Sequence, residues 1–291
     1  MAVRGQELEA EVYQAEHIEQ VLAEMAQNFP RYFEGFAQQP LTPLFEQQIA
    51  AYEKLRQKYS AYLDLEALDE FEADPNAFKR HTRNDCPIIH YALMSTDEAM
   101  KDYQYQFSMR SGRELLDAVR NIAEFGLSYA AHFQDDVHEA VGYYCDLGLE
   151  PLDEGRYGCL GVIGYGVQSN MLYGRYARCF AHRTQAAVWA FYFLSGRKTF
   201  GLLDGSEFLM ANPNTGVCEQ NYFYPAELFG FYSLKVYMML RSACRAQGVV
   251  LQDHYRYVYL SGFSDYIAEV HAEDINVLKR SSEYVESRPW F

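Results

Sequence analysis

The sequence predicts a mainly α-helical protein (α+β) with a small β-sheet, in a two-lobed architecture that resembles a helical bundle. Apolar residues recur at helical spacing over several long segments, and two shorter segments alternate as strands do. With 291 residues, 49% hydrophobic and 16% aromatic, the chain is long enough for two lobes in tight contact. We expect an acidic helical lobe over residues 1–148 and a second lobe over residues 149–291.

Two helices are predicted at the start of the first lobe. Apolar residues repeat at helical spacing over residues 6–28, and the pattern stops before Pro30. Thr42 and Pro43 are typical of an N-cap and a first helical position, which predicts an amphipathic helix through about Tyr59.

Capping signals predict further long helices in both lobes. Ser111 and Glu114 have the spacing of a capping box. The helical pattern that follows extends to Gly148, as one long helix or as two helices broken near Gly126. Pro225 opens another apolar helix, which closes at Gly248.

The small sheet is predicted from two segments that alternate in aromatic character. Residues 102–109 place two tyrosines, a phenylalanine and a methionine on one side, and residues 249–260 place three tyrosines in step. The second lobe would then contain a glycine-rich hairpin, helices and a tyrosine-rich strand.

The charge balance indicates which partners the protein can bind. Forty acidic and 25 basic residues give a net charge of −15, which repels nucleic acid and membranes and attracts basic partners. Solubility alone is the other explanation of an acidic surface. The longest apolar run, residues 186–194, is far shorter than the roughly 20 residues that span a bilayer. We therefore expect a basic protein partner and no membrane association.

The cysteines and the N-terminus indicate a cytoplasmic location. The six cysteines form no CxxC pair and lie in hydrophobic surroundings, as reduced and buried thiols do. The acidic N-terminal segment lacks the basic and then apolar character of a signal peptide.

The glycine-rich run GVIGYGVQSN is the most distinctive motif of the chain. A phosphate-binding P-loop needs a lysine after the glycines, and none lies between Lys101 and Lys198. A dinucleotide fingerprint would continue from Gly164 and Gly166 to a third glycine, but Ser169 stands there. Both nucleotide interpretations are disfavoured, and we expect no cofactor.

The Gly-Tyr-Gly turn and the helical pattern after it, over residues 161–174, resemble the helix-hairpin-helix motif of base-excision DNA glycosylases. The resemblance implies a turn whose amides face a DNA phosphate, with Gly164, Gly166, Arg178 and Arg183 as nucleic-acid contacts. In those enzymes a catalytic aspartate opens the next helix, and this chain has no carboxylate there. Glycosylase chemistry is therefore not expected, and a turn that only permits close packing is the alternative.

An arginine and a histidine have the spacing found in HEPN-type ribonucleases, where the histidine handles protons and the arginine holds phosphate. Arg175 with His182 fits this spacing, and so does Arg83 with His90, although Pro87 disturbs the second pair. Arg175 and His182 are the candidate catalytic pair.

Three residues are candidate metal ligands. His132, Asp136 and Glu139 are spaced i, i+4 and i+7, so on one helix they would share a face. Imidazole and carboxylate ligands suit zinc, manganese or iron. An ordinary acidic helix face is the alternative explanation.

Together these observations favour a non-catalytic, cytoplasmic, acidic binding protein that engages a basic macromolecular partner, of the immunity-protein or regulatory-subunit type. The alternative is a nucleic-acid-associated protein or nuclease that uses the helix-hairpin-helix-like turn and the Arg175/His182 pair. An exposed basic patch of Arg175, Arg178 and Arg183 around the turn would favour this alternative.

Overall fold

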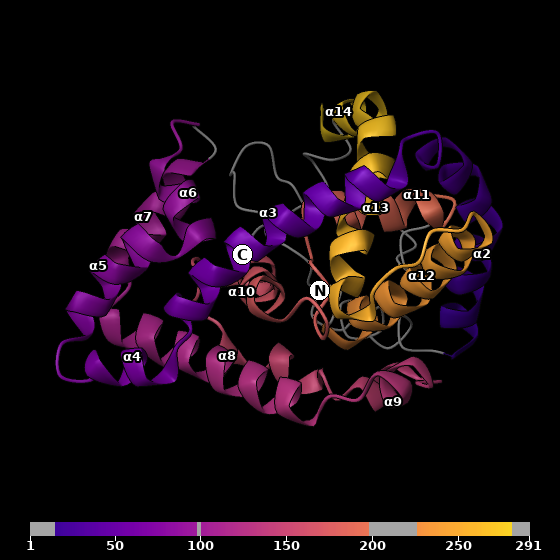
Figure 1. The fold of residues 1–291 in the computed structure, drawn as a ribbon. Coiled ribbons are helices and arrows are strands. Elements are labelled where there is room, and N and C mark those ends of the chain that lie inside the picture. Colours follow the sequence, from indigo (N-terminus) through magenta and orange to yellow (C-terminus); the bar gives the residue numbers. More distant parts are fainter. Residues whose placement is uncertain (1–14, 98–99, 198–225, 281–291) are drawn as a thin grey trace.

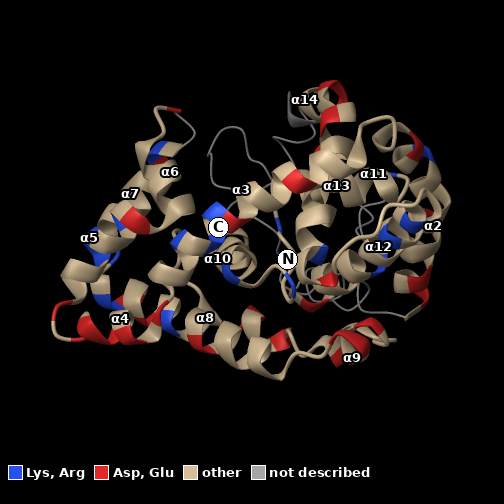
Figure 2. Ribbon diagram, viewed as in Figure 1, with Lys and Arg blue, Asp and Glu red and all other residues tan. Residues whose placement is uncertain are grey.

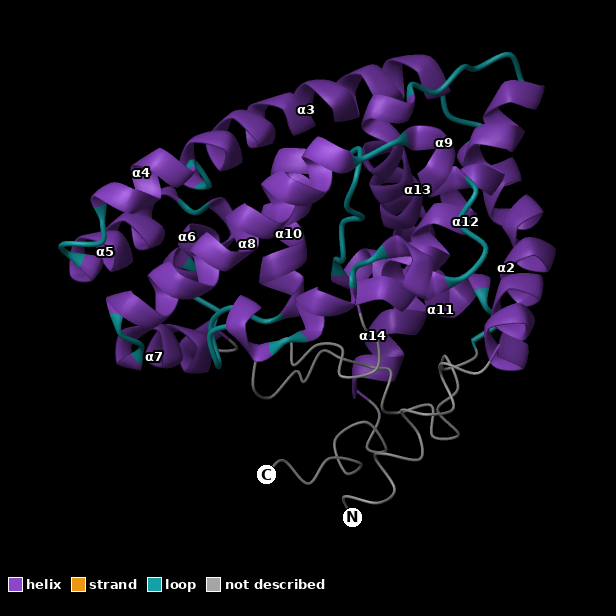
Figure 3. Ribbon diagram, turned by 90° about the horizontal axis from the view of Figure 1, so that it is seen from below, coloured by secondary structure: helices purple, strands orange, loops and turns teal. Residues whose placement is uncertain are grey.

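The computed structural model describes residues 15–97, 100–197 and 226–280, and these residues form a helical protein (Figures 1 and 3). The elements are α2 (Ala15–Phe36), α3 (Leu41–Tyr62), α4 (Leu65–Glu70), α5 (Pro75–Asp85), α6 (Pro87–Met94), α7 (Lys101–Met109), α8 (Gly112–His132), α9 (Asp135–Glu139), the 3-10 turns η2 (Tyr144–Leu147), η3 (Glu150–Asp153) and η4 (Gly155–Tyr157), α10 (Tyr165–Tyr176), α11 (Gln185–Leu194), α12 (Ala226–Ala246), the 3-10 turn η5 (Asp253–Tyr255), α13 (Arg256–Val270) and α14 (Ala272–Arg280). No helix of these three ranges is both long enough and apolar enough to cross a bilayer.

Helix α3 runs across the molecule and joins two groups of helices (Figure 1). One group contains α4 to α8, and the other contains α2 and α11 to α14. Helix α10 packs between α3 and α8, while α2 packs against α11, α12 and α13. One continuous apolar core extends from Ile18 to Ile275 and therefore crosses the boundary predicted at residue 148.

The prediction of a small β-sheet is wrong for the described residues, where the only pairing of this kind is an isolated bridge between Cys159 and Ile163. Residues 102–109 lie in α7. Tyr103 and Phe107 are four residues apart, so in a helix they share the face that packs on the core. The aromatic alternation suited a strand and a helix equally well.

The second predicted strand, residues 249–260, is a loop followed by η5 and the first turns of α13. Tyr257, Val258, Tyr259 and Leu260 are all at most 4% exposed. Because successive residues on every side of this part of α13 are buried, apolar residues do not recur at helical spacing in the sequence there.

The first two helices differ from their predicted bounds. Helix α2 continues through Pro30 to Phe36, because Phe29, Phe33 and Phe36 bury one apolar stripe that offsets the hydrogen bond lost at proline. Residues 6–14 lie outside the described residues. Helix α3 begins at Leu41 after Pro40, so Thr42 is not its N-cap.

The capping box at Ser111 and Glu114 is confirmed at the start of α8. The helix does not break near Gly126, which is buried and faces Leu172 of α10. Instead it ends at His132 and is followed by α9 and η2. Gly148 ends η2 with φ +65°, in the left-handed region expected of a capping glycine.

The apolar helix of the second half is also confirmed, over Ala226–Ala246, and Gly248 after it has φ +78°. Pro225, its predicted first residue, lies outside the described residues. Thr184 caps α11 by accepting a hydrogen bond from the Ala187 amide at 3.0 Å.

The contact between α10 and α3 depends on Gly174. A methyl group at this position would overlap the buried ring of Tyr59. We expect Gly174→Ala to lower the free energy of unfolding by about 1–3 kcal/mol in urea titrations. Gly142→Ala is the matched control because a methyl there meets nothing within 4 Å. Equal stability of the two variants would contradict this close helix contact.

Candidate functional site

The glycine-rich run forms a short turn that leads into α10. The Cys159 amide donates to the Ile163 carbonyl at 3.0 Å, and the Ile163 amide donates to the Cys159 carbonyl at 2.7 Å. Gly161 at the tip has φ +74°, which favours glycine. Gly164 is the N-cap of α10, so Gly166 lies in its first turn.

Close packing does not explain every glycine of this run. A methyl group at Gly164 would meet nothing within 4 Å, whereas one at Gly161 would lie 3.0 Å from Gln106 Cβ. The elements before the turn are 3-10 turns, and the helix after α10 is α11. Only the second helix of the expected hairpin arrangement therefore adjoins the turn.

The arginines near the turn bind protein groups. Arg175 donates from Nη1 to the carbonyl of Leu63, at the end of α3. Arg178 donates to both carboxylate oxygens of Asp135, with an Nε to Oδ1 distance of 3.2 Å. A bidentate pair of this kind holds the guanidinium in one orientation.

Arg183 is only 5% exposed. Its guanidinium carbon lies 5.0 Å from the centre of the Tyr165 ring and 5.6 Å from that of Phe229. It lines a small cavity of about 30 Å³ together with Gln168 and Ser169. The three arginines therefore form no exposed basic patch around the turn, which was the feature that would favour nucleic acid.

His182 lies in a hydrogen-bonded cluster between α3, α10 and α13. Its Nε2 is 2.8 Å from Asn170 Nδ2, and its Nδ1 is 3.3 Å from Ser261 Oγ. The ring stacks on Tyr173, with centroids 4.1 Å apart and an interplanar angle of 1°. The Tyr59 hydroxyl donates to Asn170 Oδ1. Each ring nitrogen therefore has a protein partner.

These partners decide the tautomer of His182. Because Asn170 Oδ1 accepts from Tyr59, its Nδ2 donates to His182 Nε2, and the ring proton then lies on Nδ1 and points to Ser261. Burial lowers the pKa of His182 to about 4. The neutral ring cannot accept a proton from Ser261 in this arrangement.

The structure does not bring Arg175 and His182 together. Arg175 bonds to Leu63, whereas His182 bonds to Asn170 and Ser261, and no hydrogen bond joins the pair. The spacing that suggested a catalytic pair places the two side chains in different surroundings.

The three predicted metal ligands do not share one helix. His132 is the last residue of α8, while Asp136 and Glu139 belong to α9. His132 Nδ1 bonds to the Ser128 carbonyl at 2.8 Å, and Glu139 forms two hydrogen bonds with Arg241. Within the described ranges, no group of three or more His, Cys, Asp or Glu residues could hold a metal ion.

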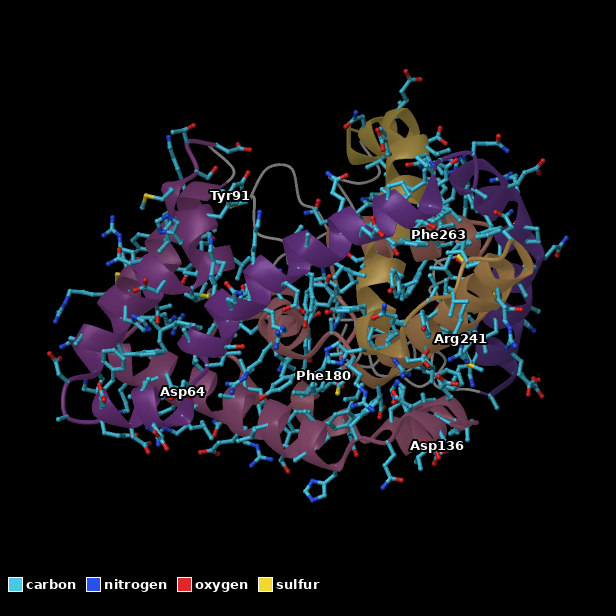
Figure 4. All side chains as sticks on the ribbon, in the orientation of Figure 1. Asp64, Tyr91, Asp136, Phe180, Arg241 and Phe263 are labelled. Carbon is cyan, nitrogen blue, oxygen red and sulfur yellow. The ribbon has the colours of Figure 1, made fainter. Side chains whose placement is uncertain are left out.

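Beside α9 lies an ion-pair network that sequence reasoning missed. Its members are three acids and three arginines, namely Asp135, Glu139, Asp253, Arg178, Arg241 and Arg256. Arg256 is fully buried; it pairs with Asp135 and lies between the rings of Phe133 and Tyr237, at 5.5 and 5.6 Å. Figure 4 labels Arg241 on α12 above Asp136 on α9. The network fastens α9 to α12, to the start of α13 and to the segment that follows α10.

Two neighbouring carboxyl groups, one from η3 and one from α12, lie at the start of α12. Asp153 accepts hydrogen bonds from the Ala226 amide at 3.1 and 3.2 Å, and Glu227 beside it is 6% exposed. Burial raises the pKa of Glu227 to about 7, and the charges of Asp153 and Glu150 add to the shift. This carboxyl therefore titrates close to neutral pH.

An apolar groove of about 730 Å³ lies between α2 and α12. Phe29, Phe33, Met238 and Met239 are among its lining residues, and Glu34 is the one ionisable residue of the lining. The groove offers hydrophobic contact and no group of side chains arranged for catalysis.

The densest charge lies on an acidic ridge, which we define as the exposed carboxylates of Glu66, Asp69, Glu70, Glu72 and Asp74. The residues follow α3 in a segment, 64–74, that holds six acids and no base. Figure 2 shows this segment as a red edge around α4. The ridge was visible in the sequence as a run of acids.

Two arginines of α8 neutralise one end of the acidic ridge. Arg113 pairs with Glu72 at 2.5 Å, and Arg120 pairs with Asp69 at 2.7 Å. Glu66 and Glu70 form no ion pair with any residue of the described ranges. These two carboxylates remain available to a partner.

No known family model, curated protein or solved structure matches this chain.

Proposed function

We propose that this acidic chain binds a basic macromolecular partner through the acidic ridge, and that this binding is non-catalytic. The observation that carries the proposal is the pair Glu66 and Glu70, exposed on α4 with no ion pair to a described residue. Unpaired surface carboxylates speed association with a basic surface and can occlude a basic active site. An immunity protein or a regulatory subunit would act in this way.

A cytoplasmic location is part of the proposal. It is supported by the free thiols of all five cysteines in the described residues, four of which are buried. The alternative of a nucleic-acid-binding protein or nuclease has less support, because Arg178 and Arg183 are engaged by Asp135 and by aromatic rings.

Native capture with charge variants tests the proposal. The untagged complex is isolated from its own cell, and bound protein and nuclease-sensitive nucleic acid are both measured. We expect one stoichiometric basic protein, whose affinity falls about tenfold in Glu66→Gln/Glu70→Gln, mostly through a slower association rate. The difference should shrink at high salt, because exposed charges are screened.

The matched control is Glu16→Gln/Glu19→Gln, which removes the same charge from exposed positions on α2. It should bind as the wild type does. Equal weakening of partner binding in both variants would show that net charge, and not the ridge, determines the affinity. Bound nucleic acid in place of a basic protein would overturn the proposal.

A further inference from the structure

Five polar side chains meet where α2, the end of α11 and the junction of α13 with α14 come together. The Tyr32 hydroxyl lies 2.8 Å from His271 Nε2, and His271 Nδ1 lies 3.0 Å from Asp274 Oδ2. Arg31 Nη2 donates to the Tyr32 hydroxyl at 2.6 Å, and Arg197 Nη2 donates to Asp274 Oδ2 at 2.9 Å. The five groups form one continuous hydrogen-bonded chain.

The carboxylate fixes the direction of this chain. The hydrogen bond from His271 lowers the pKa of Asp274, so the carboxylate is ionised and can only accept. His271 Nδ1 therefore carries the proton and donates to Asp274, which leaves Nε2 free to accept from the Tyr32 hydroxyl. A hydroxyl that donates to a base, with a carboxylate that orients the base, is the arrangement of an activated nucleophile.

The neighbouring groups hold this geometry rigidly. The His271 ring stacks on Phe193, with centroids 3.7 Å apart and planes 9° apart. Arg197 has φ +66° directly after Gly196 at φ +71°, a left-handed conformation that is strained for a side chain other than glycine. Its bond to Asp274 belongs to the contacts that keep the strained residue in place.

The arginines determine what can approach Tyr32. Tyr32 is 4% exposed, and the exposed Arg31 lies across its ring, with the guanidinium carbon 4.6 Å from the ring centre. Arg197, 55% exposed, stands at the other end of the chain. A reactant can therefore reach the hydroxyl only when the Arg31 side chain moves aside. The Arg31 guanidinium beside the Tyr32 hydroxyl suits the oxygens of a phosphoryl group.

We propose that Tyr32 is a nucleophile for phosphoryl groups, with His271 as its base and Asp274 as the residue that positions the base. The Tyr32 oxygen attacks phosphorus, and the bond from phosphorus to the leaving oxygen breaks. The phenolic proton passes to His271 Nε2 and then to the leaving oxygen, while Arg31 neutralises the phosphoryl oxygens. The site lies apart from the acidic ridge and is independent of the function proposed for it.

A dialkyl fluorophosphate tests the site in the full-length protein. The Tyr32 oxygen would bond to phosphorus, the bond from phosphorus to fluorine would break with release of fluoride, and His271 would take the proton. Intact mass and peptide mapping should show one adduct, on Tyr32, forming at least 100-fold faster than on Tyr91. Tyr91 is an internal reference because it is 80% exposed.

Two variants separate an activated hydroxyl from a structural one. Tyr32→Phe should form no adduct. Asp274→Asn should slow labelling at least tenfold, because an amide that donates to Nδ1 moves the ring proton to Nε2. Asp102→Asn, an exposed replacement on α7, should label as the wild type does. Labelling of Tyr32 no faster than Tyr91, or unchanged in a folded Asp274→Asn variant, would overturn the proposal.

Discussion

Asp135→Asn is expected to lower the free energy of unfolding by about 3–5 kcal/mol. The substitution keeps the shape of the side chain and removes the charge that pairs with both Arg178 and Arg256. Arg256 is fully buried, so its cation cannot recover hydration and would keep only the longer ion pair with Glu139, at 3.8 Å, among the described residues. Urea titrations of the purified variant measure the loss.

Two further variants identify the buried cation as the cause. Asp117→Asn removes an exposed carboxylate that lies 3.6 Å from Arg113, and it should cost less than about 1 kcal/mol. Asp135→Asn/Arg256→Met replaces the cation by an apolar chain and should recover most of the loss. A double variant as unstable as Asp135→Asn would contradict this explanation.

The protein should lose stability in mild acid because two histidines are held neutral. Burial is the main cause that lowers the pKa of His138 to about 3 and of His182 to about 4. Below pH 6.5 the unfolded chain binds a proton at each histidine while the folded chain does not. The two histidines together should remove roughly 3 kcal/mol of unfolding free energy between pH 6.5 and 5.

Glu227 acts in the opposite direction over the same range. Its pKa of about 7 in the folded protein means that it keeps a proton which the unfolded chain releases above pH 4.5, so stability falls as pH rises. In the wild type, the slope of the unfolding free energy against pH should therefore correspond to a net uptake of about one proton on unfolding between pH 5 and 6.5. Glu227→Gln should raise the slope to about two, and His182→Gln should lower it by one. Urea titrations at four pH values measure these slopes, and identical slopes in the three proteins would contradict the assignment.

Local signals predicted much of the helical fold. The capping box at Ser111, the apolar run of α12 and the left-handed glycines at 148 and 248 are all present. Such signals depend on residues a few positions apart. The strand prediction failed at α7 because an alternating pattern also contains pairs four residues apart, and burial of one face selects the helix.

The candidate sites could be predicted only in part. The acidic ridge lies in a short segment, residues 64–74, in which six of eleven residues are acidic, and this density is visible in the sequence. The ion-pair network joins Asp135 to Arg256, and the tyrosine chain joins Tyr32 to His271. No local pattern relates residues so far apart. Arg178 was predicted to contact phosphate. Its actual partner, Asp135, is distant in the sequence, so no local pattern indicated the ion pair.

The packing of α2 against the last helices has a consequence for synthesis of the protein. Phe29 lies against Phe263, with ring centroids 5.3 Å apart, near the two ends of the chain. At roughly 5–20 residues per second, a ribosome needs on the order of 10–50 s to make the intervening chain. During that time the apolar stripe of the first helix has no native surface to cover it, and we expect molecular chaperones to bind the nascent chain there until α13 has emerged.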